Sequence, residues 1–127
     1  MSAFTDRELA YLQGERRLGR IATVGKDGTP HVAPVGWSYN VDHDTIDVGG
    51  RDFEQSKKYR DVRTTGRAAI VIDDLASTNP WRPRGIEVRG RAEALEQPAL
   101  IRIHPERIVS WGIESEAIAD RHSRAVG

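Results

Sequence analysis

Turn signals recur at short intervals in the first half of the chain, and they limit each extended segment there to a few residues. Lys26-Asp27-Gly28-Thr29 follows one apolar run, and Asp42-His43-Asp44 follows the run 31–39. The alternating segment 45–48 then ends at Gly49-Gly50. Asp-Gly turns and glycine pairs between such runs are typical of antiparallel hairpins. Parallel strands would need a longer helical crossover, so the pattern favours short antiparallel strands.

Two helices and further strands complete the expected order. Thr5 and Glu8 form a capping-box pattern for a first helix, and the segment 53–65 carries a thin apolar stripe that stops before Gly66. Strict alternation at 45–48 predicts one solvent-facing side for that strand. Strands are expected at 20–24, 31–39, 45–48, 68–72, 86–94, 100–103 and 107–111, with a Pro- and Trp-bearing loop over 73–84.

Short strands, tight turns and one central helix predict a mainly β fold. We expect a small barrel of six to seven mostly antiparallel strands with a few helices. A chain of 127 residues is ordinary for one domain, so residues 1–127 are expected to form a single domain.

The charge balance and the absence of cysteine exclude several functions. The 19 basic and 19 acidic residues give a formal charge of +0, so no overall positive field attracts nucleic acid or anionic lipid. Without cysteine, disulfides, thiolate nucleophiles and Cys-based zinc sites are impossible. No run reaches the roughly 18 apolar residues that span a bilayer, and no signal-peptide pattern opens the chain. We expect a cytoplasmic protein with no metal, nucleic-acid or membrane partner.

The segment 49–60 contains the parts of a phosphate-binding cradle. A glycine pair after a strand frees backbone N–H groups, and the start of a helix adds its dipole. Ser56, Lys57 and Lys58 supply a hydroxyl and two ammonium groups. The alternative, of equal weight at this point, is a solvated helix face whose charges only keep the surface soluble.

Three tryptophans are candidates for packing or for ligand contact. Trp37 and Trp111 lie in expected strands, which favours packing in the core or at a dimer interface. Trp81 lies between Pro80 and Pro83 in the expected loop. There an apolar ring is equally compatible with covering a planar ligand and with a purely structural role.

Several of these segments stand in an order that resembles a known superfamily. They are Gly28 to Val35 (GTPHVAPV), Val48 to Arg51 (VGGR), Ser56 to Lys58 (SKK), Gly85 to Glu93 (GIEVRGRAE) and Arg102 to Gly112 (RIHPERIVSWG). The chain resembles the split-barrel flavin-binding superfamily that contains pyridoxamine 5′-phosphate oxidase. More narrowly, it is similar to the deazaflavin-dependent (coenzyme F420) oxidoreductases. The likeness covers about residues 9–113 and implies a split β-barrel homodimer with two cofactor sites at the subunit interface.

The resemblance also implies which residues bind the cofactor phosphate. Ser56, Lys57 and Lys58 match the family's phosphate-binding segment, and Gly50 and Arg51 match the strand end beside it. This assignment agrees with the cradle expected from the residue types.

Further residues are implied for the rest of the cofactor. Candidates for contact with the tricyclic ring lie on one strand: Pro34, Val35, Gly36 and Trp37. Trp81 and Arg82 fall in the loop that would close the site from the partner chain. Arg51 and Arg60 are candidates for the lactyl-polyglutamate tail of F420.

The function implied by the resemblance is that of an F420H2-dependent reductase. Hydride would pass from the deazaflavin C5 to an electron-poor double bond or a quinone-like acceptor, and no side chain is identified as a catalytic acid. The alternatives are an FMN-binding oxidoreductase of the same fold, a noncatalytic deazaflavin-binding protein, and a barrel that binds single strands of nucleic acid. The last is disfavoured by the balanced charge. His31 stands where the oxidase has a basic residue, so we do not expect vitamin B6 oxidase activity.

Overall fold

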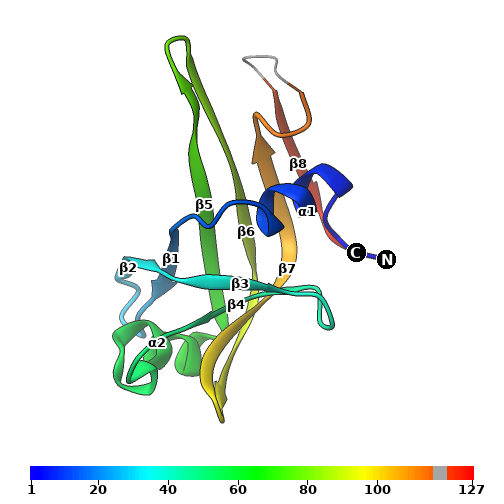
Figure 1. Cartoon of the computed structure of the whole chain (residues 1–127). Helices are drawn as coiled ribbons and strands as arrows, with labels where there is room; N and C mark the ends of the chain where they lie inside the picture. Colours follow the sequence, from blue (N-terminus) through cyan, green and yellow to red (C-terminus); the bar gives the residue numbers. More distant parts are fainter. Residues whose placement is uncertain (116–119) are drawn as a thin grey trace.

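Antiparallel strand pairing organises the part of the chain that the structure describes. The computed structural model describes residues 1–115 and 120–127. Its strands form one curled, half-open sheet in the order β2-β1-β5-β6-β7-β4-β3, with β8 pairing β7 (Figure 1). The elements are α1 (Asp6–Gln13), β1 (Gly19–Val24), β2 (Pro30–Val35), β3 (Trp37–Asn40), β4 (Thr45–Gly49), η1 (Phe53–Gln55), α2 (Lys57–Thr65), β5 (Arg67–Thr78), β6 (Trp81–Glu96), β7 (Ala99–Trp111) and β8 (Arg121–Ala125).

The expected mainly β, antiparallel split barrel is confirmed, with differences in its strands. The segment 31–39 is two strands rather than one, because the chain breaks its pairing at Gly36: β2 pairs β1, and β3 pairs β4. As a result, β2 and β3 form the two ends of the strand order. The sheet is therefore split between two strands that are neighbours in the sequence.

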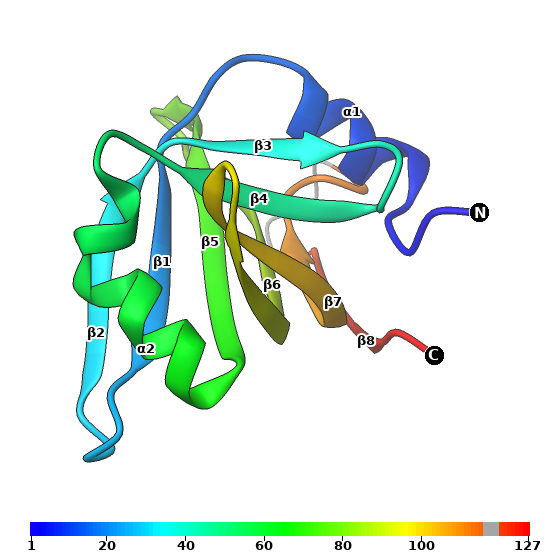
Figure 2. The ribbon, with the colours of Figure 1, turned by 90° about the horizontal axis from the view of Figure 1, so that it is seen from below.

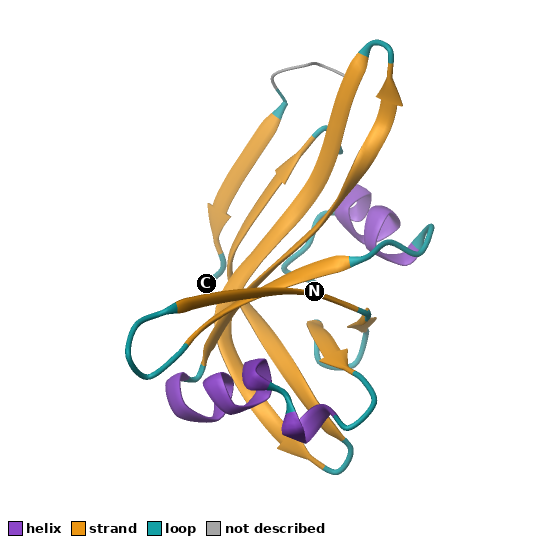
Figure 3. Ribbon diagram, turned by 90° about the vertical axis from the view of Figure 1, so that its left-hand side faces the viewer, coloured by secondary structure: helices purple, strands orange, loops and turns teal. Residues whose placement is uncertain are grey.

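The prediction of a loop over residues 73–84 is wrong. Residues 67–96 form one long hairpin, in which β5 pairs β6 from Arg67↔Arg91 to Thr78↔Trp81, with a register shift between Leu75 and Ser77. Only Asn79 and Pro80 turn the chain. The prolines that suggested a loop are accommodated at the turn and beside the register shift, where the ladder needs fewer N–H donors. The hairpin projects well past β4 and β3 (Figure 3).

The C-terminal half also holds longer strands than expected. The segments 100–103 and 107–111 belong to a single strand, β7, with a register shift between Arg89 and Gly90 on its partner β6. Strand β8 was missed by the sequence analysis, which leaves eight strands among the described residues in place of six to seven. Its residues, RHSRA, show no apolar alternation, so the periodicity signal for a strand is missing there.

Strand β4 lacks the solvent-facing side that its alternating sequence predicts. Thr45, Ile46, Asp47 and Val48 are all buried. Asp47 is buried because it is an ion-pair partner: Arg102 donates to it through two nitrogens at 3.1 Å each, and Asn40 donates at 2.9 Å. Paired in this way, a carboxylate can lie in the interior of a sheet.

The capping box of the first helix and the end of the second are as expected, but the second helix begins later than expected. Thr5 and Glu8 form the predicted capping box of α1. The segment 53–65 is interrupted, since Ser56 has extended backbone angles and caps α2 through its side chain. Gly66 ends α2 in the left-handed region, φ 69°, where glycine is the favoured residue. Helix α2 lies alongside β1 and β2 (Figure 2), with Tyr59 and Val62 buried in the common core.

Candidate functional site

The residues expected to bind a phosphate meet where α2 begins, beside the β1–β2 hairpin (Figure 2). Ser56 is the N-cap of α2, and its hydroxyl accepts a hydrogen bond from the Tyr59 N–H while donating to the Phe53 carbonyl. The hydroxyl is therefore already engaged in the local fold. The Gly49–Gly50 pair closes β4 and leads into this turn, as the sequence predicts.

A buried carboxylate, which the sequence analysis missed, lies at the centre of this region. Asp61 of α2 accepts hydrogen bonds from the Thr23 hydroxyl at 2.8 Å and the Lys57 ammonium at 3.0 Å. Its second oxygen also lies 2.9 Å from Nδ1 of His31. The spacing of Lys57 and Asp61, four residues apart on a helix, was the available signal.

Hydrogen bonds to Asp61 lower its pKa by more than burial raises it. Burial alone would raise the pKa of the carboxyl group, but the hydrogen bonds from Thr23, Lys57 and His31 hold its pKa below the ordinary value. Asp61 is therefore a carboxylate at neutral pH. It fixes the first turns of α2 to both strands of the hairpin.

The cationic side chains of this region differ in how far they are engaged. Lys57 is paired with Asp61, and the Lys58 ammonium lies 5.4 Å from the centre of the Phe53 ring. Within the described residues, no ion pair is found for Lys58, Arg51 or Arg60. Arg51 and Arg60 are exposed, so their charges are available to an anion.

The four expected ring-contact residues do not all face the same way. Pro34 and Gly36 are exposed, and nothing lies within 4 Å of the position of a Cβ at Gly36. Val35 is 7% exposed and belongs to the core, so its side chain is not available to a ligand. The Trp37 indole is half-buried and donates a 2.7 Å hydrogen bond to the Arg17 carbonyl.

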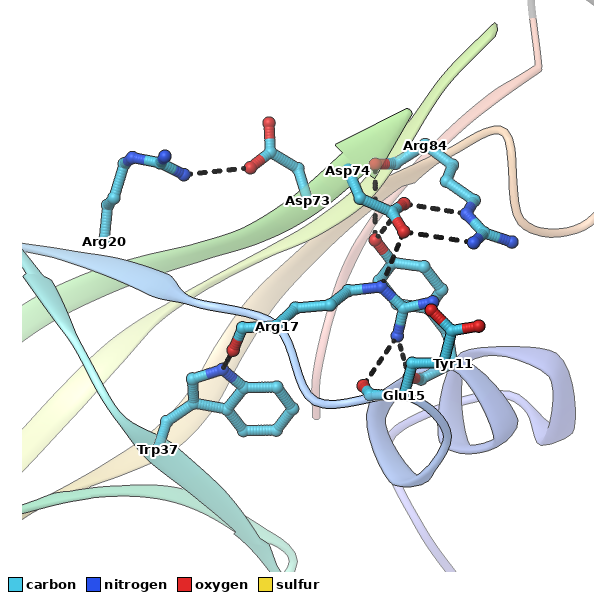
Figure 4. A network of polar contacts seen from close by, with 8 residues as sticks. All are labelled: Tyr11, Glu15, Arg17, Arg20, Trp37, Asp73, Asp74 and Arg84. Carbon is cyan, nitrogen blue, oxygen red and sulfur yellow. Dashed lines mark hydrogen bonds and ion pairs between the residues drawn. The ribbon is translucent and has the colours of Figure 1, made fainter. Parts of the chain in front are cut away.

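Trp37 also borders a cleft of about 280 Å³ between β3 and the segment that follows α1. That segment is fixed by a network around Asp74 (Figure 4). Arg84 donates to Asp74 at 2.7 and 3.0 Å, Arg17 at 2.9 Å, and the Tyr11 hydroxyl at 2.9 Å. The guanidinium of Arg17 also lies 3.8 Å from the centre of the Tyr11 ring. The wall of the cleft beside Trp37 is thus firmly held.

The same contacts shift the pKa values of the network. Burial raises the pKa of Asp74, but the hydrogen bonds from Arg84, Arg17 and Tyr11 outweigh it and lower the pKa to about 2. Burial and the hydrogen bond to Asp74 raise the pKa of Tyr11 above its ordinary value.

Trp81 lies apart from the other candidates. It opens β6 at the tip of the projecting hairpin, while α2 lies at the opposite end of the sheet (Figure 1). The residue is 64% exposed. Within one chain, Trp81 therefore lies outside the region around the start of α2.

Comparison with known proteins identifies the family. A family model described as pyridoxamine 5′-phosphate oxidase matches residues 5–126. The chain is 38% identical over 133 residues to the 5a,11a-dehydrotetracycline/5a,11a-dehydrooxytetracycline reductase of Streptomyces rimosus, covering 97% of this chain and 93% of that protein. The chain belongs to the pyridoxamine 5′-phosphate oxidase family, and this relative supports an oxidoreductase.

Solved structures with the same fold are more distant in sequence. One is described as an F420 reductase, with a TM-score of 0.59, 21% identity, and coverage of 78% of this chain and 94% of that chain. Another is an FAD-binding protein from Mesorhizobium loti, with a TM-score of 0.61, 20% identity, and coverage of 84% and 93%. These two structures share the fold of this chain.

Among the residues that the structure describes, no group of three or more side chains that could hold a metal ion is found. None of the helices in the described part of the chain has the length and apolar character to cross a membrane.

Proposed function

We propose that this protein is an F420H2-dependent reductase that acts on an electron-poor double bond of a small organic acceptor. The observation that carries the proposal is the group of cationic side chains around the start of α2, a helix that contacts β2 through Asp61 and His31. The relative from Streptomyces rimosus adds support, because its name describes reduction of a 5a,11a-dehydro compound.

The residues present fit a phosphorylated tricyclic cofactor. Arg51 and Arg60 are exposed, and Lys57 keeps 55% of its side chain exposed despite its ion pair. Arg60 lies on α2 and Arg51 lies in the turn before η1, so a polyanionic tail would find cations at both places. Gly36, between β2 and β3, has open space where a side chain would stand, so a flat ring can approach the backbone there.

The chain's own residues would anchor and orient the cofactor rather than carry out the reaction. Lys57 and Lys58 would bind the phosphate, Arg51 and Arg60 would bind the anionic tail, and the exposed residues Pro34 and Gly36 would support one face of the ring. When bound, F420H2 supplies a hydride from C5. Such a site works by holding donor and acceptor in reacting geometry and by excluding water.

The acceptor would lie beside the ring, next to Trp37. The cleft of about 280 Å³ that Trp37 borders is also lined by Ser38, Tyr39 and Arg16. An aromatic wall with a few polar groups is typical of a site for a planar organic molecule.

A second chain would complete the site. Trp81 is exposed at the tip of a long hairpin and lies far from α2 of its own chain. We therefore propose a homodimer in which the partner's Trp81 covers the cofactor.

The proposal is tested by removing the two lysines. Lys57→Ala/Lys58→Ala should weaken F420 binding by about tenfold or more, because two charge-assisted contacts to the phosphate are lost. Binding is measured by quenching of tryptophan fluorescence, with F420 and FMN titrated in parallel. The control Arg7→Ala/Arg63→Ala removes the same total charge from exposed helix positions and should leave the affinity unchanged.

Each result of this titration assigns the cofactor differently. Micromolar F420 binding with weak FMN binding supports the deazaflavin reductase, and the reverse preference makes the protein an FMN-binding oxidoreductase. Equal affinity of the wild type and the double lysine variant would refute the placement of the phosphate. Binding of F420 without reduction of any acceptor in a screen would indicate a noncatalytic carrier.

A further inference from the structure

The buried carboxylate of Asp61 links two side chains that reach the surface. The side chain of Asp61 is 2% exposed, whereas those of Lys57 and His31 are 55% and 35% exposed. Lys57 binds one carboxylate oxygen, and His31 and Thr23 contact the other. A single buried group thus sets the direction of an ammonium from α2 and an imidazole from β2.

Both of these side chains approach the same point of the backbone, at Gly25. A Cβ at Gly25 would lie 3.3 Å from Cε1 of His31 and 3.6 Å from Nζ of Lys57. Gly25 begins the β1–β2 turn, where its N–H donates to the Thr29 carbonyl at 2.9 Å. The space above Gly25 is therefore bordered by two nitrogen-bearing side chains.

One negative group also lies at this space. Oδ1 of Asp27 would be 3.1 Å from the same Cβ position. The pKa of Asp27 is lowered mainly by hydrogen bonds from Thr29, with a smaller contribution from the charge of Lys57. The neighbourhood therefore contains both signs of charge, and anion binding there depends on where the Lys57 ammonium is held.

We propose that Asp61 is a positioning residue, which holds Lys57 and His31 over Gly25 so that both contact the phosphate of the cofactor. A lysine stem in solvent samples many rotamers, and ordering it costs conformational entropy when a ligand binds. The ion pair with Asp61 fixes the stem beforehand. The identity of the ligand rests on the proposed function, whereas the arrangement of the three side chains does not.

If Asp61 positions these groups, removing its charge should change the affinity for an anion in the direction opposite to that expected from charge alone. Removing a negative charge near two nitrogen-bearing groups should by itself strengthen anion binding. If Asp61 positions those groups, Asp61→Asn should instead weaken it. The two effects can therefore be told apart by direction alone.

The experiment compares Asp61→Asn with Glu54→Gln, which removes the same charge from an exposed position on η1. We expect Asp61→Asn to bind F420 or FMN about tenfold more weakly than the wild type, and Glu54→Gln to stay within about twofold, by fluorescence quenching. Equal or tighter binding by Asp61→Asn would overturn the inference and leave the proposed function standing. If Asp61→Asn does not fold, as judged by circular dichroism, Thr23→Val replaces it; weaker binding supports the inference, and wild-type affinity overturns it.

A second measurement does not depend on the cofactor. In ¹⁵N NMR spectra, the neutral His31 ring should carry its proton on Nδ1 in the wild type, because that nitrogen faces Asp61, and this preference should be lost in Asp61→Asn. If the wild type binds neither F420 nor FMN, the proposed function fails, and inorganic phosphate becomes the probe. A phosphate-induced shift of the His31 signals that is lost in Asp61→Asn supports the inference. Equal shifts in both proteins, or no shift in the wild type, overturn it.

Discussion

At the scale of single residues, individual carboxylates accept hydrogen bonds from several donors. Asp74 and Asp61 each accept hydrogen bonds from side chains of other elements, and both pKa values are lowered although burial alone would raise them. Such a group contributes to stability only while it is ionised. Acid should therefore destabilise this protein by protonating these carboxylates.

Asp74 gives the clearest pH dependence. Its pKa falls from 3.8 to about 2 on folding, so its contribution is fully present above about pH 4 and is lost as the pH falls toward 2. The size of the shift corresponds to about 2 kcal/mol. Asp74→Asn should lower the free energy of unfolding at pH 7 by about this amount or more, and should flatten the decline between pH 4 and pH 2.

Urea unfolding followed by tryptophan fluorescence at pH 7 and pH 3 measures this prediction. The neighbouring change Asp73→Asn is the control, because Asp73 forms only an exposed pair with Arg20 at 3.2 Å and such pairs contribute little. If both variants lost equal stability at pH 7, the network around Asp74 would not have the role assigned to it.

At the scale of elements, β8 and α1 are joined by one charged pair. Arg124 of β8 donates to Glu8 of α1 at 3.0 and 2.6 Å, and to the Ala3 carbonyl at 2.7 Å. The Glu8 side chain is fully buried, at 0% exposed. The N-terminal helix and the last strand therefore depend on each other.

Arg124→Ala should destabilise the protein by about 3 kcal/mol, because it leaves a buried carboxylate without its cation. The control is Arg121→Ala, an exposed arginine on the same strand, for which we expect a change within about 0.5 kcal/mol. Chemical denaturation measures both. A loss of less than about 1 kcal/mol for Arg124→Ala would show that α1 is held mainly by its apolar contacts.

At the scale of the whole molecule, the open sheet leaves an apolar surface on β1 and β2. Val24 is 43% exposed and Val32 is 72% exposed. The edge of β2 is a poor site for strand addition, because Pro30 and Pro34 have no N–H to donate. We therefore expect a second copy to cover the face of this hairpin rather than to extend its edge.

Light scattering coupled to gel filtration should give twice the chain mass of 14.2 kDa. Val32→Arg should shift the protein toward the monomer, since it places a charge on the covered face. Val41→Arg, at a residue that is 68% exposed in the β3–β4 turn, should remain dimeric. A wild-type protein of single-chain mass would contradict the dimer, and with it the covering role of the partner's Trp81.

The sequence alone determined the local features, because these depend on neighbouring residues. The capping box at Thr5 and Glu8, the end of α2 at Gly66 and the hairpin turn at Asp27-Gly28 follow from backbone preferences and short-range hydrogen bonds. The mainly β, antiparallel class follows from the spacing of such turns.

Only the tertiary structure decided which distant residues meet. Asp61 joins Thr23 and His31 across 38 and 30 positions in the sequence, and Glu8 joins Arg124 across 116. Strand β8 forms because its backbone pairs with β7. Asp47 of β4 is buried because Arg102 pairs with its carboxylate. Patterns of apolar residues do not report such pairing. Neighbouring residues thus determine the local elements, while the site depends on long-range polar contacts that form only when the sheet curls around its core.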